Sequence, residues 1–224
     1  MTALITNVAI QKTTFKYEIP YMLLITAVLL VMGMTGNEIT FIEGVILWIL
    51  FIAYLLYLYI LAKKGNDSGD EQSVKLYPVW KCLLFIVLGG VCVVIGSQFV
   101  VNGATTIARA CGMSERFIGL TIVAFGTSLP ELVTSVSAAR KRNAGIAIGN
   151  IVGSNIFNIL FVIGTVALIC PVPFESRFVI DTVVAILCGV LLWGGTIRHK
   201  ELRKPCGVVM LLCYAAYFVY LAAM

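Results

Sequence analysis

The sequence predicts an all-α membrane protein with about seven transmembrane helices. Hydrophobic residues make up 60% of its 224 residues and charged residues 12%, whereas charged residues are about 25% of an ordinary soluble domain. A soluble fold of this length cannot hide so much apolar surface, so lipid must be the solvent for much of the chain.

Apolar runs of about 20 residues mark the spans, because a helix of that length crosses the hydrocarbon core. They cover 18–36, 40–61, 79–108, 117–139, 147–169, 178–197 and 206–223. Between the second and third runs, residues 63–77 have the polar, Gly-containing composition of a linker.

Basic residues predict the orientation of the spans. Thirteen of the sixteen lysines and arginines fall on one side, and Arg109, Arg116 and Arg177 fall on the other. The positive-inside rule then makes the N-terminus and the linker cytoplasmic and the C-terminus external, in the plasma (inner) membrane. Because these charges lie in short loops between apolar runs, the net charge of +5 does not indicate a nucleic-acid partner. The expected partner is the lipid bilayer.

The chain contains an internal repeat. Residues 3–5 and 167–169 both read Ala-Leu-Ile, and after a one-residue gap the matches continue 163 positions apart. The matched residues are Glu18 with Asp181, Gly44-Val45 with Gly207-Val208, Tyr54 with Tyr217, and Tyr57-Leu58 with Tyr220-Leu221. The predicted topology inverts the two copies, a pattern shared by many secondary transporters.

The repeat predicts the domain organisation. Residues 1–62 form the two-helix end of a truncated first repeat, 63–77 the cytoplasmic linker, and 78–224 a complete second repeat of five helices. Residues 78–164 have no earlier counterpart. We therefore expect three helices of the first repeat to be absent before Met1.

One carboxylate stands out as a candidate functional group. Of 27 charged side chains, Glu131 alone sits well inside an apolar segment, where an unpaired carboxylate costs several kcal/mol. Pro130 and Gly126 predict a helix break near 126–130 that frees backbone carbonyls. Thr127 and Ser128 share the face of Glu131. Such an all-oxygen set suits hard cations such as Ca²⁺ and Na⁺.

The following span, 147–169, supplies a second polar face. Asn150, Ser154 and Asn158 follow each other at intervals of four residues and form one stripe. Gly149 and Gly153 form a small-xxx-small pair that would permit close contact between helices. We expect this stripe and the carboxylate face to close on one ion near the midplane of the bilayer.

Structural interpretations of the same residues remain open. Glu131 could be a protonated, hydrogen-bonded acid, and the polar stripe could only join two helices. Asn150 and Asn155 could orient backbone groups. Gln98 and Asn102, in the third span, are assigned to helix packing or to the lining of a pathway.

These two segments resemble the sodium/calcium exchanger family of the calcium/cation antiporter superfamily. The matching residues are Gly126–Glu131 and Gly149–Asn158, which look like the second of that family's two α-repeats. The resemblance implies a ten-helix fold, of which this chain runs from the fourth span to the last. It also implies exchange of Ca²⁺ against Na⁺, or H⁺ or K⁺ in some members, by alternating access.

The resemblance implies oxygen ligands for the transported ions on the spans 117–139 and 147–169. They are Glu131 for both Ca²⁺ and Na⁺, the carbonyls of Thr127 and Ala124, Ser128 and Ser154 for Na⁺, and Asn158 at the central site. The ions are cargo, and no cofactor is expected.

The function expected from the sequence is secondary active cation antiport, with a partner chain supplying the first α-repeat. The alternative is a non-transporting fragment or structural subunit of a truncated or split exchanger. An enzyme is not expected. An intramembrane hydrolase would need a Ser/His or paired-Asp arrangement, and no His and no second mid-span carboxylate lie in the predicted spans.

Overall fold

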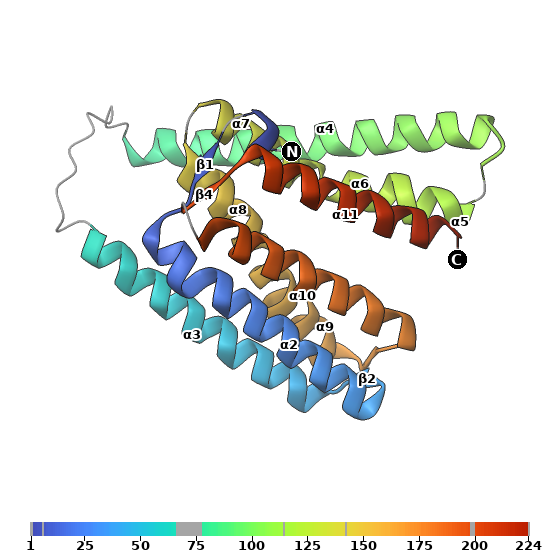
Figure 1. Ribbon diagram of the computed structural model, residues 1–224, viewed down its shortest axis with the longest axis horizontal. Helices are drawn as coiled ribbons and strands as arrows, with labels where there is room; N and C mark the ends of the chain where they lie inside the picture. Colours follow the sequence, from blue (N-terminus) through green and yellow to red (C-terminus); the bar gives the residue numbers. More distant parts are fainter. Residues whose placement is uncertain are drawn as a thin grey trace.

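The computed structural model describes residues 2–5, 7–65, 78–113, 115–141, 143–197 and 200–223. Helices dominate it (Figure 1). Its π-helical turns are named η1 to η3. The elements in chain order are α1 (Thr2–Ile5), β1 (Val8–Ala9), η1 (Thr14–Glu18), α2 (Ile19–Gly36), β2 (Glu38–Ile39), α3 (Phe41–Gly65), α4 (Val79–Ala110), α5 (Glu115–Ile118), η2 (Gly119–Val123), α6 (Ala124–Thr127), α7 (Leu129–Arg140), α8 (Ala144–Phe157), η3 (Asn158–Ile163), α9 (Gly164–Ile169), β3 (Val172–Pro173), α10 (Ser176–Ile197), β4 (Glu201–Leu202) and α11 (Lys204–Ala223).

The helices bear out the predicted all-α membrane fold. Within the described ranges, five are long and apolar enough to cross a bilayer: Thr14–Gly36, Phe41–Lys64, Val79–Ala110, Gly145–Ile169 and Phe178–Ile197. A bent pair, Thr121–Thr127 with Leu129–Arg140, would make a sixth. The last predicted span is occupied by α11, whose apolar part, Lys204–Tyr220, is shorter.

The largest differences from the predicted boundaries are in the first two spans. The first span begins at Thr14, four residues before the predicted start at residue 18, because η1 continues directly into α2. The second extends through Gly65. The rest of the predicted linker, residues 66–77, lies outside the described residues.

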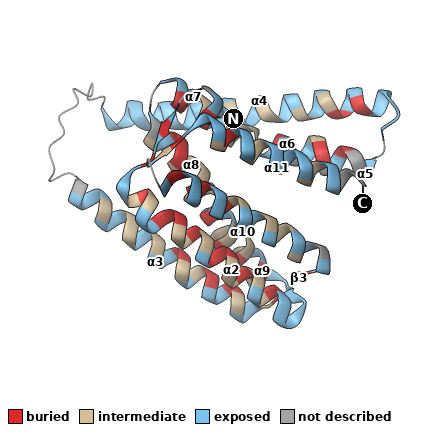
Figure 2. Ribbon diagram, in the orientation of Figure 1, coloured by how far each residue is buried: buried red, intermediate tan, exposed pale blue. Residues whose placement is uncertain are grey.

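The helices form two groups (Figure 1). In one group α2 packs against α10 and against α8–η3, while α3 packs against η3 and α9. In the other, α4 lies along α5, η2, α6 and α7. Buried residues concentrate in α2 and α8 (Figure 2). The long helix α4 has no buried residue in its most apolar window, as expected of a helix that faces lipid.

Two short antiparallel ladders join the copies of the repeat. β1 pairs with β4, Val8 opposite Leu202, and β2 pairs with β3, Ile39 opposite Val172. In the repeat register β1 corresponds to β3 and β2 to β4. Each copy therefore gives one strand to each ladder. This exchange is the pairing that a two-fold relation between the copies produces.

Equivalent glycines make equivalent helix contacts. A Cβ atom on Gly44 of α3 would lie 3.0 Å from the Cβ of Ala167 in α9. A Cβ atom on Gly207 of α11 would lie 2.9 Å from the Cβ of Ala3 in α1. Gly44 matches Gly207, and Ala3 matches Ala167. The short helix α1 therefore packs on α11 as the end of the α8–α9 span packs on α3.

Gly44 provides a test of this packing. In Gly44→Val, the added side chain would also meet the Gly164 carbonyl oxygen, which lies 3.0 Å from the Cβ position. Overpacking costs about 1–3 kcal/mol. We expect a thermal midpoint about 2–12 °C lower in detergent, at about 2–4 °C per kcal/mol for a protein of this size.

The matched control is Gly90→Val in α4, where a Cβ atom would meet nothing within 4 Å. Both variants introduce the same β-branched residue into a helix, so their helix-propensity costs cancel. Equal midpoints for the two variants would contradict the close contact between α3 and α9.

Candidate functional site

The predicted helix break lies at Ser128. α6 ends at Thr127, α7 begins at Leu129, and the two axes differ by 51°. The Ser128 N–H bonds to the Phe125 carbonyl oxygen at 3.1 Å, closing a tight turn. Pro130, in the first turn of α7, lacks the N–H that a continuous helix would need. Glu131 therefore stands at a helix N-terminus, where the helix dipole favours a carboxylate.

Two π-helical segments flank the site. η2 leads directly into α6, and η3 begins at Asn158, the last residue of the polar stripe. Such segments hold an extra residue per turn and are frequent at functional sites. They shift the faces of both spans partway along. A regular helical wheel drawn from the sequence cannot place residues correctly across such a shift.

Gly126 lets the broken helix approach α4. A Cβ atom at this position would overlap the Val101 side chain of α4. Any larger residue would therefore push α6 away from α4. The requirement for glycine here comes from packing, in addition to the loosening of the helix that the sequence predicts.

One oxygen of Glu131 is buried without a partner. Its Oε2 atom is inaccessible to solvent and makes no hydrogen bond with the described part of the chain. A desolvated carboxylate oxygen in this state is costly unless a proton or a cation neutralises it. The sequence left open that Glu131 is a hydrogen-bonded structural acid. The Oε2 atom does not fit that interpretation, because it has no hydrogen-bond partner among the described residues.

Asn150 fixes the carboxylate's helix against α8. Its Nδ2 atom donates to the Glu131 carbonyl oxygen at 3.1 Å and to the Ser135 Oγ atom at 3.0 Å. α7 ends at Arg140 and α8 starts at Ala144, so the short connection makes the two helices antiparallel neighbours. The Asn150 amide nitrogen therefore positions backbone.

Ser154 lies one turn beyond Asn150 on α8. In an antiparallel pair that places it level with the turn before Glu131, where α6 and α7 separate. The Ser154 hydroxyl donates to the Ile151 carbonyl oxygen at 3.1 Å, which leaves its oxygen lone pairs available as acceptors. Asn155 donates to the same carbonyl at 2.8 Å and is thus occupied within its own helix.

The other predicted ligands lie around the break. Ala124 is the first residue of α6 and Thr127 its last, and Ser128 follows it. Asn158 is the first residue of η3. Thr127, Ser128 and Asn158 are exposed. The structure thus places the predicted ligands on the two successive segments α6–α7 and α8–η3, of which α7 and α8 pack against each other.

The predicted role of Gly149 and Gly153 is wrong for the described residues. A Cβ atom on either glycine would meet no described atom within 4 Å, so neither mediates a close helix contact there. The reason is that α8 packs through two other faces. Ile148 and Val152 are buried in the bundle core, and Asn150 contacts α7.

A cavity with a mixed lining adjoins the break. Its volume is about 270 Å³, its polar lining residues are Ser97, Gln98 and Asn102 of α4 and Thr127, and the rest of its wall is apolar. Gln98 and Asn102 are four residues apart in an apolar helix, and this spacing puts both on one face. In the sequence, the spacing of these two polar residues was the sign of a polar face on this helix. Their position in the lining of the cavity favours a role in a pathway over a role in helix packing.

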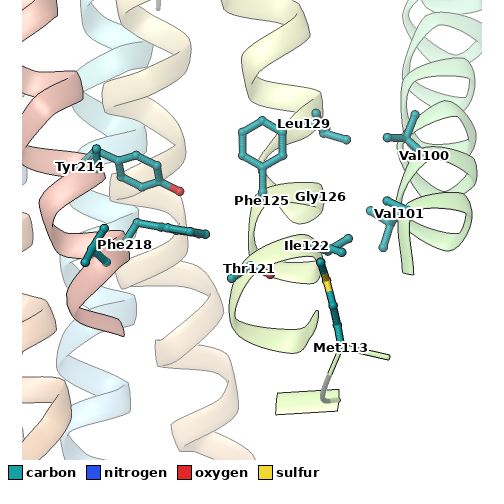
Figure 3. A pocket seen from close by; sticks show the side chains of 13 residues that line it. Val100, Val101, Met113, Thr121, Ile122, Phe125, Gly126, Leu129, Tyr214 and Phe218 are labelled. Atoms are coloured by element: carbon teal, nitrogen blue, oxygen red, sulfur yellow. The ribbon is translucent and has the colours of Figure 1, made fainter. Parts of the chain in front are cut away.

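A second cavity, of about 720 Å³, is apolar. Figure 3 shows Phe125 and Gly126 of α6 between Tyr214 and Phe218 of α11 on one side and Val101 of α4 on the other. No carboxylate lines this cavity or the smaller one. The candidate ion site is therefore placed by the buried Oε2 atom of Glu131 beside the helix break, and not by either cavity.

Comparison with known proteins decides the family. The family described as sodium/calcium exchanger protein matches residues 81–223, which contain both halves of the site. The putative antiporter CaxA of Alkalimonas amylolytica is 34% identical over 226 residues, covering 96% of this chain and 70% of that protein. This chain belongs to the sodium/calcium exchanger family.

Two further members of this exchanger family are similar to the chain. The sodium/calcium exchanger MaX1 of Methanosarcina acetivorans is 49% identical over 92 residues, which are 41% of this chain and 26% of MaX1. Among solved structures, the sodium-calcium exchanger NCX_Mj matches with a TM-score of 0.78 and 31% identity, over 98% of this chain and 70% of that one. The resemblance and the exchanger fold predicted from the sequence are thus confirmed.

Replacing Asn150 tests the bridge between α7 and α8. Asn150→Ala removes both hydrogen bonds and leaves the buried Ser135 hydroxyl without its donor. We expect a loss of about 1 kcal/mol or more, measured as a lower thermal midpoint in detergent. Asn155→Ala is the control, because it loses only a bond within its own helix. Equal effects would show that the bridge does not hold the two helices together.

Proposed function

We propose that this protein exchanges Ca²⁺ against Na⁺ by alternating access in the plasma (inner) membrane, with Glu131 as a ligand of both ions. The N-terminus would be cytoplasmic and the C-terminus external. The observation that supports this most is the unpartnered, buried Oε2 atom of Glu131. The family to which the chain belongs is one of cation antiporters.

The ligands would come from both sides of the helix break. Thr127 and Ala124 would offer carbonyl oxygens, Ser128 and Ser154 hydroxyl oxygens to Na⁺, and Asn158 an amide oxygen at the central site. Oxygen donors of this kind are the ones that hard cations take. Because Ca²⁺ and Na⁺ would compete for one carboxylate, only one kind of ion would occupy it at a time, as exchange requires.

Charge balance supports a partner. One carboxylate neutralises half of the charge of Ca²⁺, and the deficit is large in a medium of low dielectric constant. We propose that a second acidic residue comes from a first α-repeat supplied by a partner chain. The same charge argument favours a second candidate function, a non-transporting fragment or structural subunit, for the chain by itself.

The test of the site is Na⁺-driven uptake of radioactive Ca²⁺ into vesicles containing the reconstituted protein and its first α-repeat. Glu131→Gln should lower the initial rate by about 100-fold, since truncating one partner of a buried charge pair costs about 2–5 kcal/mol. Glu38→Gln is the control, because it neutralises an exposed carboxylate outside the spans. Equal rates in Glu131→Gln and the unchanged protein would overturn the site.

The test of the partner uses the same vesicles. We expect no Na⁺-dependent uptake by this chain alone. Uptake should appear on co-reconstitution with the part of CaxA that this chain does not cover. Uptake by the chain alone would refute the need for a partner, and its absence in both arms would favour the structural subunit.

A further inference from the structure

A separate cavity lies between α2 and α3, on other helices than the ion site. Its volume is about 310 Å³, the lower end of the range for small-molecule sites, about 300–1,000 Å³. Four tyrosines and one acid line it, with Leu50 and Ala53 completing the wall. These five residues, Tyr17, Glu18, Tyr21, Tyr54 and Tyr57, are called the tyrosine pocket below.

The acid of this pocket is buried and has no ionic partner. Glu18 is 9% exposed, and the part of the chain that the structure describes offers it no salt bridge. The Tyr57 hydroxyl is buried in the same pocket without a hydrogen-bond partner. A buried carboxylate and an unused hydroxyl facing one cavity both indicate a missing positively charged or hydrogen-bonding ligand.

The rings indicate which kind of cation fits. Tyr54 stacks with Tyr21 at a centroid distance of 5.5 Å and with Tyr57 at 6.2 Å, while Tyr17 tilts against Tyr57 at 6.2 Å. A metal ion would need several oxygen ligands, and this pocket holds a single carboxylate. Aromatic rings beside one carboxylate suit an organic ammonium group.

The repeat supplies an internal comparison. The equivalent cavity in the second copy lies between α10 and α11 and includes Tyr217 and Tyr220. There the Tyr217 hydroxyl donates to the Asp181 Oδ1 atom at 2.6 Å, so the acid is already satisfied. Tyr17 and Tyr21 are replaced by Ile180 and Val184. The second copy therefore lacks both the open acid and two of the rings.

Lys16 adds a second charge at the rim. Its Nζ atom lies 5.3 Å from the centroid of the Tyr17 ring. A ligand whose ammonium group reached Glu18 would thus have a cation next to its outer end. This arrangement of one acid inside and one base at the mouth complements a zwitterion with an inner ammonium and an outer phosphate.

We propose that the tyrosine pocket binds the ammonium group of a zwitterionic phospholipid headgroup, with Glu18 as its counter-ion and Lys16 facing the phosphate. Tyr17 and Lys16 lie in the first turns of the first span, where headgroups meet the protein. The open face of the pocket, with Tyr17 51% exposed, lets such a headgroup enter from the lipid side.

Native mass spectrometry of the full chain in detergent tests this proposal. The probes are phosphatidylethanolamine, phosphatidylcholine and phosphatidylglycerol with identical acyl chains. We expect the two ammonium lipids to be retained and phosphatidylglycerol to be retained about tenfold less. Glu18→Gln should lower ammonium-lipid retention about tenfold, while Asp181→Asn should leave it unchanged. Equal retention of all three lipids, or full retention by Glu18→Gln, would overturn the proposal.

Two additions keep the result decisive. Tyr17→Ile introduces the residue found in the second copy, so it should fold if Glu18→Gln does not, and it too should lower retention. Soluble glycerophosphocholine carries the same ammonium and phosphate groups, so as a competitor it should displace the retained ammonium lipid. No displacement would show that the acyl chains and not the headgroup hold the lipid, and would overturn the proposal. Ca²⁺ uptake should survive in Glu18→Gln, which separates this site from Glu131.

Discussion

The arrangement of this protein depends on one carboxylate, that of Glu131, whose Oε2 atom the fold buries and leaves without a hydrogen-bond partner among the described residues. Burying a charged group without a partner costs several kcal/mol of folding free energy. The Oε2 atom of Glu131 has neither solvent nor a hydrogen-bond donor from the described residues. Near this atom the helix is interrupted at Ser128. The side-chain amide of Asn150 donates a hydrogen bond to the backbone carbonyl of Glu131. These features make sense together if a cation completes the site.

The internal repeat of the sequence also appears in the structure. The two ladders and the contacts of Gly44 and Gly207 are related by the same offset that the sequence repeat shows. Inverted repeats of this kind are shared by many secondary transporters. The repeat also diverges where it acquires separate roles: Asp181 is satisfied by Tyr217, whereas its counterpart Glu18 faces an open pocket of tyrosines.

Much of this could be predicted from the sequence, because hydrophobic runs and single breaking residues act locally. The spans, the break next to Pro130 and the placement of Glu131 and Asn150 on successive helices all follow from short-range patterns. The open space beside Gly149 and Gly153 could not be predicted, since it depends on which faces of α8 other helices cover. The cavity lined by both Gln98 and Thr127 could not be predicted either. The same holds for the burial of Glu18: this residue was predicted to be the first of its span, but η1 extends the helix in front of it. Tertiary contacts decide these features, and the π-helical turns shift the helical faces on which a sequence pattern relies.

Infrared difference spectroscopy tests the central claim most directly. Spectra of the chain co-reconstituted with a first α-repeat would be recorded with and without Ca²⁺, for the unchanged protein and for Glu131→Gln. We predict that Ca²⁺ shifts a carboxylate stretching band in the unchanged protein and that the component from position 131 is lost in the variant. Identical difference spectra for the two proteins would show that no ion contacts Glu131 and would contradict the account.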